Sequence, residues 1–262
     1  MTDSSAPCIM EISAVSKTFG GVHALEDVSF HIRPEQILAL IGPNGAGKTT
    51  LLNIIAGMFE PTVGEVRFRG QSLNGIPTHR RVRLGIGRTF QQALAFEHMT
   101  VLENALVGCH IQGRSELLGA AFRLPYMRHE EEDSRLEAVR CLNLVGLGGK
   151  AHEEASSLPF GQQRLLAIAR ALAAKPALLL LDEPAAGLNR MEKNDLGDLI
   201  HRIQEMGITV VLVEHDMELV MRLAEWVVVL DHGRRLAEGT PRDIRRNQAV
   251  IGAYLGTEGE EC

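Results

Sequence analysis

Residues 42–50 form a glycine-rich segment that reads Gly42-Pro43-Asn44-Gly45-Ala46-Gly47-Lys48-Thr49-Thr50 and fits the pattern G-x-x-x-x-G-K-T. An apolar run, Ile37–Ile41, precedes it and predicts a buried strand, and residues 51–56 follow it with a composition suited to a helix. In that setting the glycines let the backbone fold closely around a polyphosphate with its N–H groups pointing inward. The helix that follows presents its positive end to the same anion, so the segment predicts a nucleoside triphosphate site.

Two side chains at the end of this segment have defined tasks in such a site. Lys48 can reach the outer phosphates, and the hydroxyl of Thr49 can ligate magnesium. We therefore expect all nine residues of 42–50 to bind the nucleotide, with Lys48 acting on the reacting phosphate and Thr49 on the metal ion.

The composition of the chain limits the classes of protein to which it can belong. Its 262 residues, 45% of them hydrophobic, suffice for one large domain or for one domain with a subdomain. The net charge of −6 argues against nucleic acid as a partner. The longest apolar runs are far shorter than the roughly 20 residues of a membrane helix, residues 1–7 lack the features of a secretory signal, and the four cysteines form no cluster. These features predict a soluble cytosolic protein with reduced thiols.

The order of the predicted elements indicates an α/β fold. Strand-like stretches at 9–15, 28–32 and 65–69 predict an N-terminal antiparallel β region. Strands and helices alternate again from 177 onward, which predicts a mainly parallel central sheet. Between these parts, residues 92–160 show helical signals and no strand signals. We expect 92–160 to be a helical subdomain inserted into the nucleotide-binding core.

An acidic pair follows the apolar run 177–181 and supplies carboxylates for phosphoryl transfer. A strand that ends in Asp182 places its carboxylate at the carboxyl edge of the sheet, beside the glycine-rich segment, where ligands of such sheets bind. Asp182 can hold magnesium through water, and Glu183 can polarise the attacking water.

A second apolar strand, 208–213, ends in polar residues at the same edge. His215 in this position can hydrogen-bond the terminal phosphate of the nucleotide. The alternative is a structural histidine whose ring is satisfied by solvent.

Several motifs occur in the order found in ATP-binding subunits of ABC transporters. They are 42–49, 88–91 (Arg-Thr-Phe-Gln), 158–164 (Leu-Pro-Phe-Gly-Gln-Gln-Arg), Asp182-Glu183 and His215. The chain resembles this family from about residue 9 to residue 256. The resemblance implies a single ABC ATP-binding domain over 1–262 with a P-loop NTPase core, ATP and Mg²⁺ as ligands, and head-to-tail pairing of two such subunits around the nucleotides.

The resemblance also implies roles for residues outside the glycine-rich segment. Gly161 and Gln162 belong to the signature segment that contacts the ATP held by the partner subunit. Gln91 contacts magnesium and the attacking water and couples the site to a transmembrane partner. Phe19 stacks on adenine, with a packing role in the core as the alternative.

The signature segment departs from the common L-S-G-G-Q, because Pro159 replaces the serine and Phe160 follows it. The serine hydroxyl donates to the terminal phosphate across the dimer, and proline has no donor in its side chain or its backbone. Two interpretations stay open. The composite site is weaker and a partner's half carries the main activity, or the N-terminus of the helix after Pro159 suffices.

The form L-P-[YF]-G-Q-Q-R is typical of the ATPases of branched-chain amino acid importers. The chain also resembles that branch at 88–91, at 185–189, where Asn189 replaces the more common Asp, at 239–241 and at 253–256. Importers of urea or amides share much of this pattern, so they are the alternative within the family.

The resemblance implies an ATP-hydrolysing subunit that lies on the cytoplasmic face of the membrane and drives separate transmembrane permease subunits. A second ATP-binding subunit, identical or related, completes the motor, and an external solute-binding protein acts through the permease. A soluble P-loop kinase or GTPase is the distant alternative, but it has no use for a signature segment. ABC proteins of translation or DNA repair need more chain than 262 residues.

Two runs of charge are expected to have structural roles. Arg80, Arg81, Arg83 and Arg88 predict a solvated basic face, with a lipid or partner contact as the alternative. The acidic run 130–133 predicts a solvated helix start.

Overall fold

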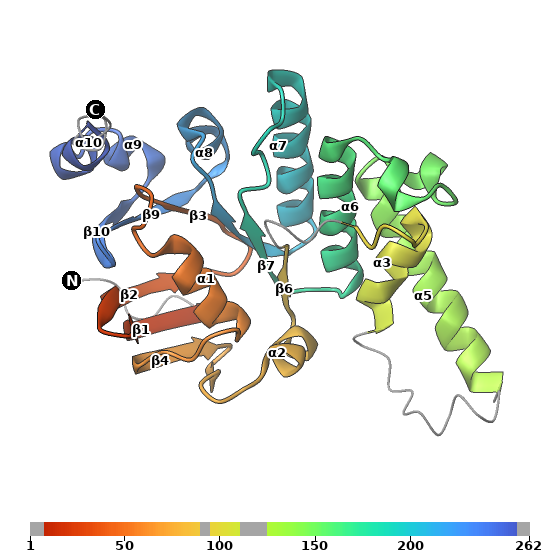
Figure 1. The fold of residues 1–262 in the computed structure, drawn as a ribbon, viewed down its shortest axis with the longest axis horizontal. Coiled ribbons are helices and arrows are strands. Elements are labelled where there is room, and N and C mark those ends of the chain that lie inside the picture. Colours follow the sequence, from red (N-terminus) through yellow and green to blue (C-terminus); the bar gives the residue numbers. More distant parts are fainter. Residues whose placement is uncertain (1–7, 90–94, 111–124, 256–262) are drawn as a thin grey trace.

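The computed structural model describes residues 8–89, 95–110 and 125–255. Its strands form a four-stranded sheet with the order β2-β1-β4-β5 and a six-stranded sheet with the order β10-β9-β3-β8-β7-β6 (Figure 1). The bounds of the smaller sheet are β1 Met10–Phe19, β2 Val22–Ile32, β4 Val63–Phe68 and β5 Gln71–Ser72. Those of the larger sheet are β3 Ile37–Ile41, β6 Ile86–Arg88, β7 Leu178–Asp182, β8 Thr209–Val213, β9 Trp226–Asp231 and β10 Arg234–Gly239.

The smaller sheet is antiparallel, as predicted. Its strands β1 and β2 extend beyond the apolar stretches 9–15 and 28–32 from which they were predicted. β1 pairs with β2 and with β4 along most of its length, and both pairings contain register shifts. The apolar alternation stops at Val15 because the tip of the β1–β2 hairpin is exposed, although its backbone remains paired. The hairpin turns at Gly20 and Gly21, which both have positive φ.

The larger sheet is parallel except for β10, which turns back from β9 at Gly233. Every residue of β3, β7 and β8 is buried. Runs of Leu, Ile and Val without alternation form such strands because helices or a second sheet cover both faces. This confirms the predicted α/β fold with a mainly parallel central sheet.

Helices cover the sheet and extend the molecule to one side (Figure 1). Those of the core are α1 Lys48–Ala56, α2 Thr78–Leu84, α7 Arg190–Glu205, α8 Met217–Leu223, α9 Pro241–Ile244 and α10 Gln248–Leu255. Between β6 and β7 lie α3 Val101–His110, α5 Pro125–Leu144, α6 Phe160–Ala173 and two short 3-10 turns. Thr100 and Glu103 form a capping box at the start of α3, in which each side chain accepts from the other's backbone N–H. No helix within the described ranges has the length and apolar character needed to cross a membrane.

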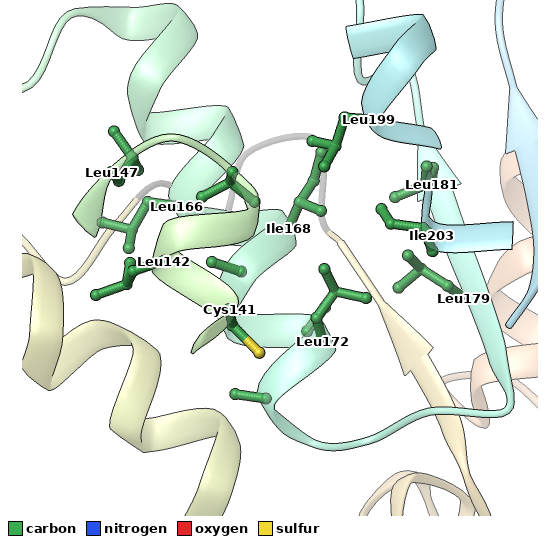
Figure 2. Packing of buried hydrophobic residues seen from close by; sticks show 14 of the residues in the cluster. Cys141, Leu142, Leu147, Leu166, Ile168, Leu172, Leu179, Leu181, Leu199 and Ile203 are labelled. Atoms are coloured by element: carbon green, nitrogen blue, oxygen red, sulfur yellow. The ribbon is translucent and has the colours of Figure 1, made fainter. Parts of the chain in front are cut away.

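Helix α6 joins the helical region to the central sheet. Leu166 lies beside Leu142 and Leu147 of the helical region, and Ile168 points toward Leu199 of α7 (Figure 2). All of these side chains belong to one buried cluster that also includes Leu181 of β7. The boundaries of the inserted helical subdomain, 92 and 160, remain a prediction. The helical region and the central sheet share one core because α6 packs against both.

The arginine cluster does not form one solvated face. Arg80 and Arg83 are exposed, but the Arg81 side chain is 1% exposed and donates to the carbonyls of Ile54 and Leu73. The side chain of Arg88 is 7% exposed and pairs with Asp182. The prediction was wrong for these two residues, because their guanidinium groups find several acceptors at once and therefore tolerate removal from water.

The burial of Arg81 predicts a large effect on stability. Arg81→Ala would remove the guanidinium donor from four buried or half-buried carbonyls, which should cost about 3–5 kcal/mol. The free energy of unfolding in urea measures this loss. Arg80→Ala, one residue away and exposed, is the control and should change stability by less than about 0.5 kcal/mol. Equal effects of the two substitutions would contradict the structural role.

Candidate functional site

The glycine-rich segment, Asp182, Glu183 and His215 lie at the carboxyl ends of three adjacent strands. Leu40 of β3 is level with Val213 of β8, and Val213 is level with Asp182 of β7. The glycine-rich segment follows β3, Asp182 ends β7, and residues 214–216 follow β8. The parallel register therefore brings together groups that are more than 170 residues apart in the sequence.

The glycine-rich segment forms the expected loop into α1. Gly45 and Gly47 have φ values of 78° and 99°, which side chains of L-residues rarely adopt. A Cβ on Gly47 would lie 2.6 Å from the carbonyl oxygen of Ala24. Gly47 is also the N-cap of α1 and provides no side chain to cap it. The first N–H groups of α1 are thus available to an anion, as the phosphate site requires.

The side chains of this segment differ in exposure. Asn44 and Thr49 are exposed, Pro43 and Thr50 are half-buried, and Ala46 is buried. Lys48 is buried, and its Nζ donates to the carbonyl oxygens of Gly42 at 2.7 Å and Pro43 at 2.8 Å. Burial lowers the pKa of Lys48, against the attraction of Glu183 and Asp182. The ammonium group is therefore held over the loop, in contact with neutral acceptors that phosphate oxygens can replace.

Asp182 lies in a buried ion pair. Its Oδ2 is 3.0 Å from Nη2 of Arg88, whose Nη1 also donates to Asn53 on α1. Burial raises the pKa of Asp182 despite the opposing effect of Arg88. Oδ1 of Asp182 is buried and has no hydrogen-bond partner among the described residues. A buried carboxylate oxygen left without a donor fits a water held by magnesium, which prefers oxygen ligands and keeps several of its waters.

Glu183 and His215 form a pair at the mouth of the site. Oε1 of Glu183 is 2.7 Å from Nε2 of His215, and the two side chains are 19% and 43% exposed. Glu183 has a φ of 48°, so the chain turns sharply directly after β7. Arg164 of α6 donates through Nη1 to the Glu183 carbonyl. The carboxylate is therefore accessible to water and has a defined orientation.

Glu214 was not predicted and organises the turn after β8. Its side chain is buried and accepts from the N–H groups of Ala185 at 2.7 Å and His215 at 3.2 Å. Burial raises its pKa, and these backbone donors oppose the rise. The signal in the sequence is an acidic residue directly after an apolar strand, the same signal that identified Asp182. Glu214 therefore fixes the backbone conformation at His215.

Phe19 ends β1 and is 41% exposed, which argues against a purely internal packing role. Its ring meets the ring of Phe59 edge-on at 5.2 Å, and Nζ of Lys17 lies 5.0 Å from the Phe19 ring centre. Phe59 was missed because nothing in its sequence context distinguishes it from a core residue. An exposed aromatic pair is suited to stacking on a planar ligand.

The signature segment lies apart from the glycine-rich loop of the same chain. Gly161 and Gln162 occupy the first turn of α6, and Pro159 is its N-cap and gives no side-chain bond. Gln162 accepts from Nζ of Lys150. Figure 1 shows β6 and β7 between α6 and α1. Gln91 lies outside the described residues.

This arrangement of loop, carboxylates and signature helix defines an ATP-binding cassette. The family profile for ABC transporters matches residues 25–186, and the chain belongs to this family. The class hydrolyses ATP to drive transport, and the chain is an ATPase of that class. A second profile, of branched-chain amino acid ATP-binding cassette transporters, matches residues 234–260.

Curated relatives and solved structures agree with this assignment. The chain is 43% identical to the high-affinity branched-chain amino acid transport ATP-binding protein BraF of Pseudomonas aeruginosa, over 95% of this chain and 98% of the relative. It is 41% identical to LivG of Escherichia coli (strain K12), with the same coverage. A crystal structure of a nucleotide-free ATP-binding cassette from an ABC transporter has a TM-score of 0.83 and 30% identity, over 95% of this chain and 99% of that one.

The crowding at Gly47 predicts a test of the loop. Gly47→Ala should destabilise the fold by about 2–4 kcal/mol, because a left-handed conformation and a steric overlap are both imposed, and it should abolish ATP binding. Gly45→Ala is the control: its φ is also positive, but its Cβ would meet nothing within 4 Å. Urea unfolding and equilibrium ATP titration measure both effects. A Gly47→Ala protein as stable as Gly45→Ala would show that the close approach to Ala24 is unimportant.

Proposed function

We propose that the chain is the ATP-hydrolysing subunit of a branched-chain amino acid importer. One observation carries the proposal: the loop, Asp182 and Glu183 meet at one sheet edge in a chain that matches BraF and LivG over nearly its full length. The match of residues 234–260 to the branched-chain profile supports the same solute class.

In the proposed site, residues 42–50 hold the phosphates of ATP through backbone N–H groups, and Lys48 moves from the Gly42 and Pro43 carbonyls to phosphate oxygens. Thr49, Asp182 and Gln91 hold Mg²⁺, which neutralises charge on the phosphates. Phe19, supported by Phe59, stacks on adenine. The unpartnered Oδ1 of Asp182 supports its part of this assignment.

Glu183 orients and polarises the attacking water in the proposed mechanism. Its carboxylate stands next to the loop, and the hydrogen bond to Nε2 of His215 limits its rotation. His215 then donates to the terminal phosphate when that group is present. Arg164 holds the backbone of Glu183 from α6, so movement of the signature helix changes the position of the carboxylate.

A second ATP-binding subunit completes each site. Gly161, Gln162 and the N-terminus of α6 face the nucleotide of the partner, which explains why they lie apart from the loop of their own chain. A solved dimeric ABC cassette has a TM-score of 0.76 to this chain at 30% identity. We propose the same head-to-tail pairing here, with an identical or a related chain.

The other partners follow from the proposed transport role. Transmembrane permease subunits bind the chain at the cytoplasmic face of the membrane, and an external solute-binding protein acts through them. We propose that residues 92–160 are the subdomain that meets the permease, together with Gln91. Its helices α3 and α5 project from the core (Figure 1).

A reconstituted system tests the solute class. The chain is assembled with its permease, partner ATPase and binding protein in liposomes, and ATP hydrolysis and uptake are measured with leucine, isoleucine, valine, urea and acetamide. The proposal predicts stimulation by the three amino acids only. Stimulation by urea or acetamide alone would assign the chain to the other importer branch, and the Glu183→Gln complex gives the background.

Glu183→Gln should separate binding from turnover. The amide keeps the size of the side chain but cannot accept a proton from water, so we expect a loss of about 10²–10⁴ in kcat with ATP affinity unchanged. The variant should accumulate as an ATP-bound dimer on size-exclusion chromatography. Phosphate release at the rate of the natural sequence would remove Glu183 from the water-polarising role.

Pro159→Ser tests the unusual signature segment. The substitution gives the N-cap of α6 a hydroxyl donor, and serine is a favourable N-cap residue. Steady-state ATP hydrolysis should stay the same or increase. A large decrease would mean that proline has a positive role at this position.

A further inference from the structure

Two exposed aromatic rings near the glycine-rich loop share one lysine. Phe19 at the end of β1 and Phe59 after α1 are 41% and 36% exposed, and their rings meet edge-on at 5.2 Å. Nζ of Lys17 lies 5.0 Å from the centre of the Phe19 ring and 5.9 Å from that of the Phe59 ring. Both distances are within the roughly 6 Å at which a cation and an aromatic ring attract each other. The ammonium group of Lys17 therefore attracts both rings at once.

The backbone fixes the position of this ammonium group. Nζ of Lys17 donates to the carbonyl oxygen of Glu60 at 2.7 Å. The carboxylate of Glu60 pairs with Arg81 instead, and within the described part of the chain no carboxylate forms an ion pair with Lys17. The positive charge of Lys17 is thus held against the two rings and one neutral acceptor.

The rings lie close to the site for the phosphates. Phe19 pairs with Val22 across the β1–β2 hairpin. Ala24 is two residues, or roughly 7 Å, further along β2, and it lies against the glycine-rich loop, because a Cβ on Gly47 would be 2.6 Å from its carbonyl oxygen. A planar apolar ligand group attached to phosphates that bind 42–50 can therefore reach the ring of Phe19.

We propose that Lys17 is a positioning residue for the base of the nucleotide: its ammonium group holds the rings of Phe19 and Phe59 in the orientation in which Phe19 stacks on adenine. The proposal rests on the proposed function in that the ligand is ATP. Without the cation, two exposed rings rotate about their side-chain bonds, and this freedom is lost when the base binds. The anchored lysine restricts the rings beforehand, and such preorganisation raises affinity because less freedom is lost on binding.

Loss of the ammonium group should weaken binding of the base and leave binding of the phosphates unchanged. Lys17→Met keeps a long apolar side chain but removes the charge and the hydrogen bond to Glu60. A cation–π interaction at an exposed site corresponds to a factor of about two to five in affinity, which is the weakening that we expect for ATP. Lys17→Arg should restore ATP binding, because a guanidinium group also binds aromatic faces and carbonyl oxygens.

The experiment compares ATP with inorganic tripolyphosphate, which has three phosphates and no base. Both ligands are titrated calorimetrically in EDTA into the full chain in natural form, as Lys17→Met and as Lys17→Arg. Lys175→Met is the matched control, because Lys175 follows α6 and pairs with Glu137 at 3.7 Å. Hydrolysis assays with magnesium give KM and kcat, and urea unfolding reports the stability of each variant.

We expect Lys17→Met to bind ATP more weakly, with a higher KM, an unchanged kcat and an unchanged affinity for tripolyphosphate. Lys17→Arg and Lys175→Met should match the natural chain. An unchanged affinity of Lys17→Met for ATP would overturn the proposal. An equal loss for ATP and tripolyphosphate would also overturn it, because Lys17 would then act on the phosphates or on the fold, and so would Lys17→Arg binding ATP as weakly as Lys17→Met. If the natural chain binds neither ATP nor tripolyphosphate, the proposed function fails instead.

Discussion

The rest of the structure depends on oppositely charged side chains that lie close together and are buried at the carboxyl edge of a parallel sheet. Lys48 and Asp182 are both buried there, and burial disfavours the charged form of each: it lowers the pKa of the lysine and raises that of the aspartate. Arg88 offsets the cost for Asp182, and backbone carbonyls do so for Lys48. A site that binds a polyanion with a divalent cation needs this dry, charged edge, because electrostatic attraction is stronger where water is excluded.

The buried strands β3, β7 and β8 hold this edge in register, and α6 connects it to the rest of the chain. One side of α6 packs on the helical region and another on α7, so the helix is part of a continuous core (Figure 2). Arg164 reaches from α6 to the carbonyl of Glu183. Movement of the helical region relative to the core can therefore act on Glu183, the carboxylate that we propose polarises water, and a transport motor needs coupling of this kind.

The sequence predicted those parts of the fold that depend on the pattern of neighbouring residues. The apolar runs gave the buried strands, and the glycine-rich pattern predicted a loop whose Gly45 and Gly47 indeed have positive φ. Contacts made by tertiary structure could not be predicted. Arg81 and Arg88 look like surface charges until the fold surrounds them with acceptors. Glu214 binds the backbone N–H group of Ala185, and a backbone N–H leaves no mark in the sequence.

The most direct measurement is hydrogen exchange of the purified chain with and without ATP and magnesium, followed peptide by peptide. We expect strong protection of residues 42–50 on addition of Mg·ATP, and protection of the start of α6 only when a second ATP-binding subunit closes on the site. Saturating Mg·ATP that leaves 42–50 unprotected, in the chain alone and in the assembled pair, would contradict it.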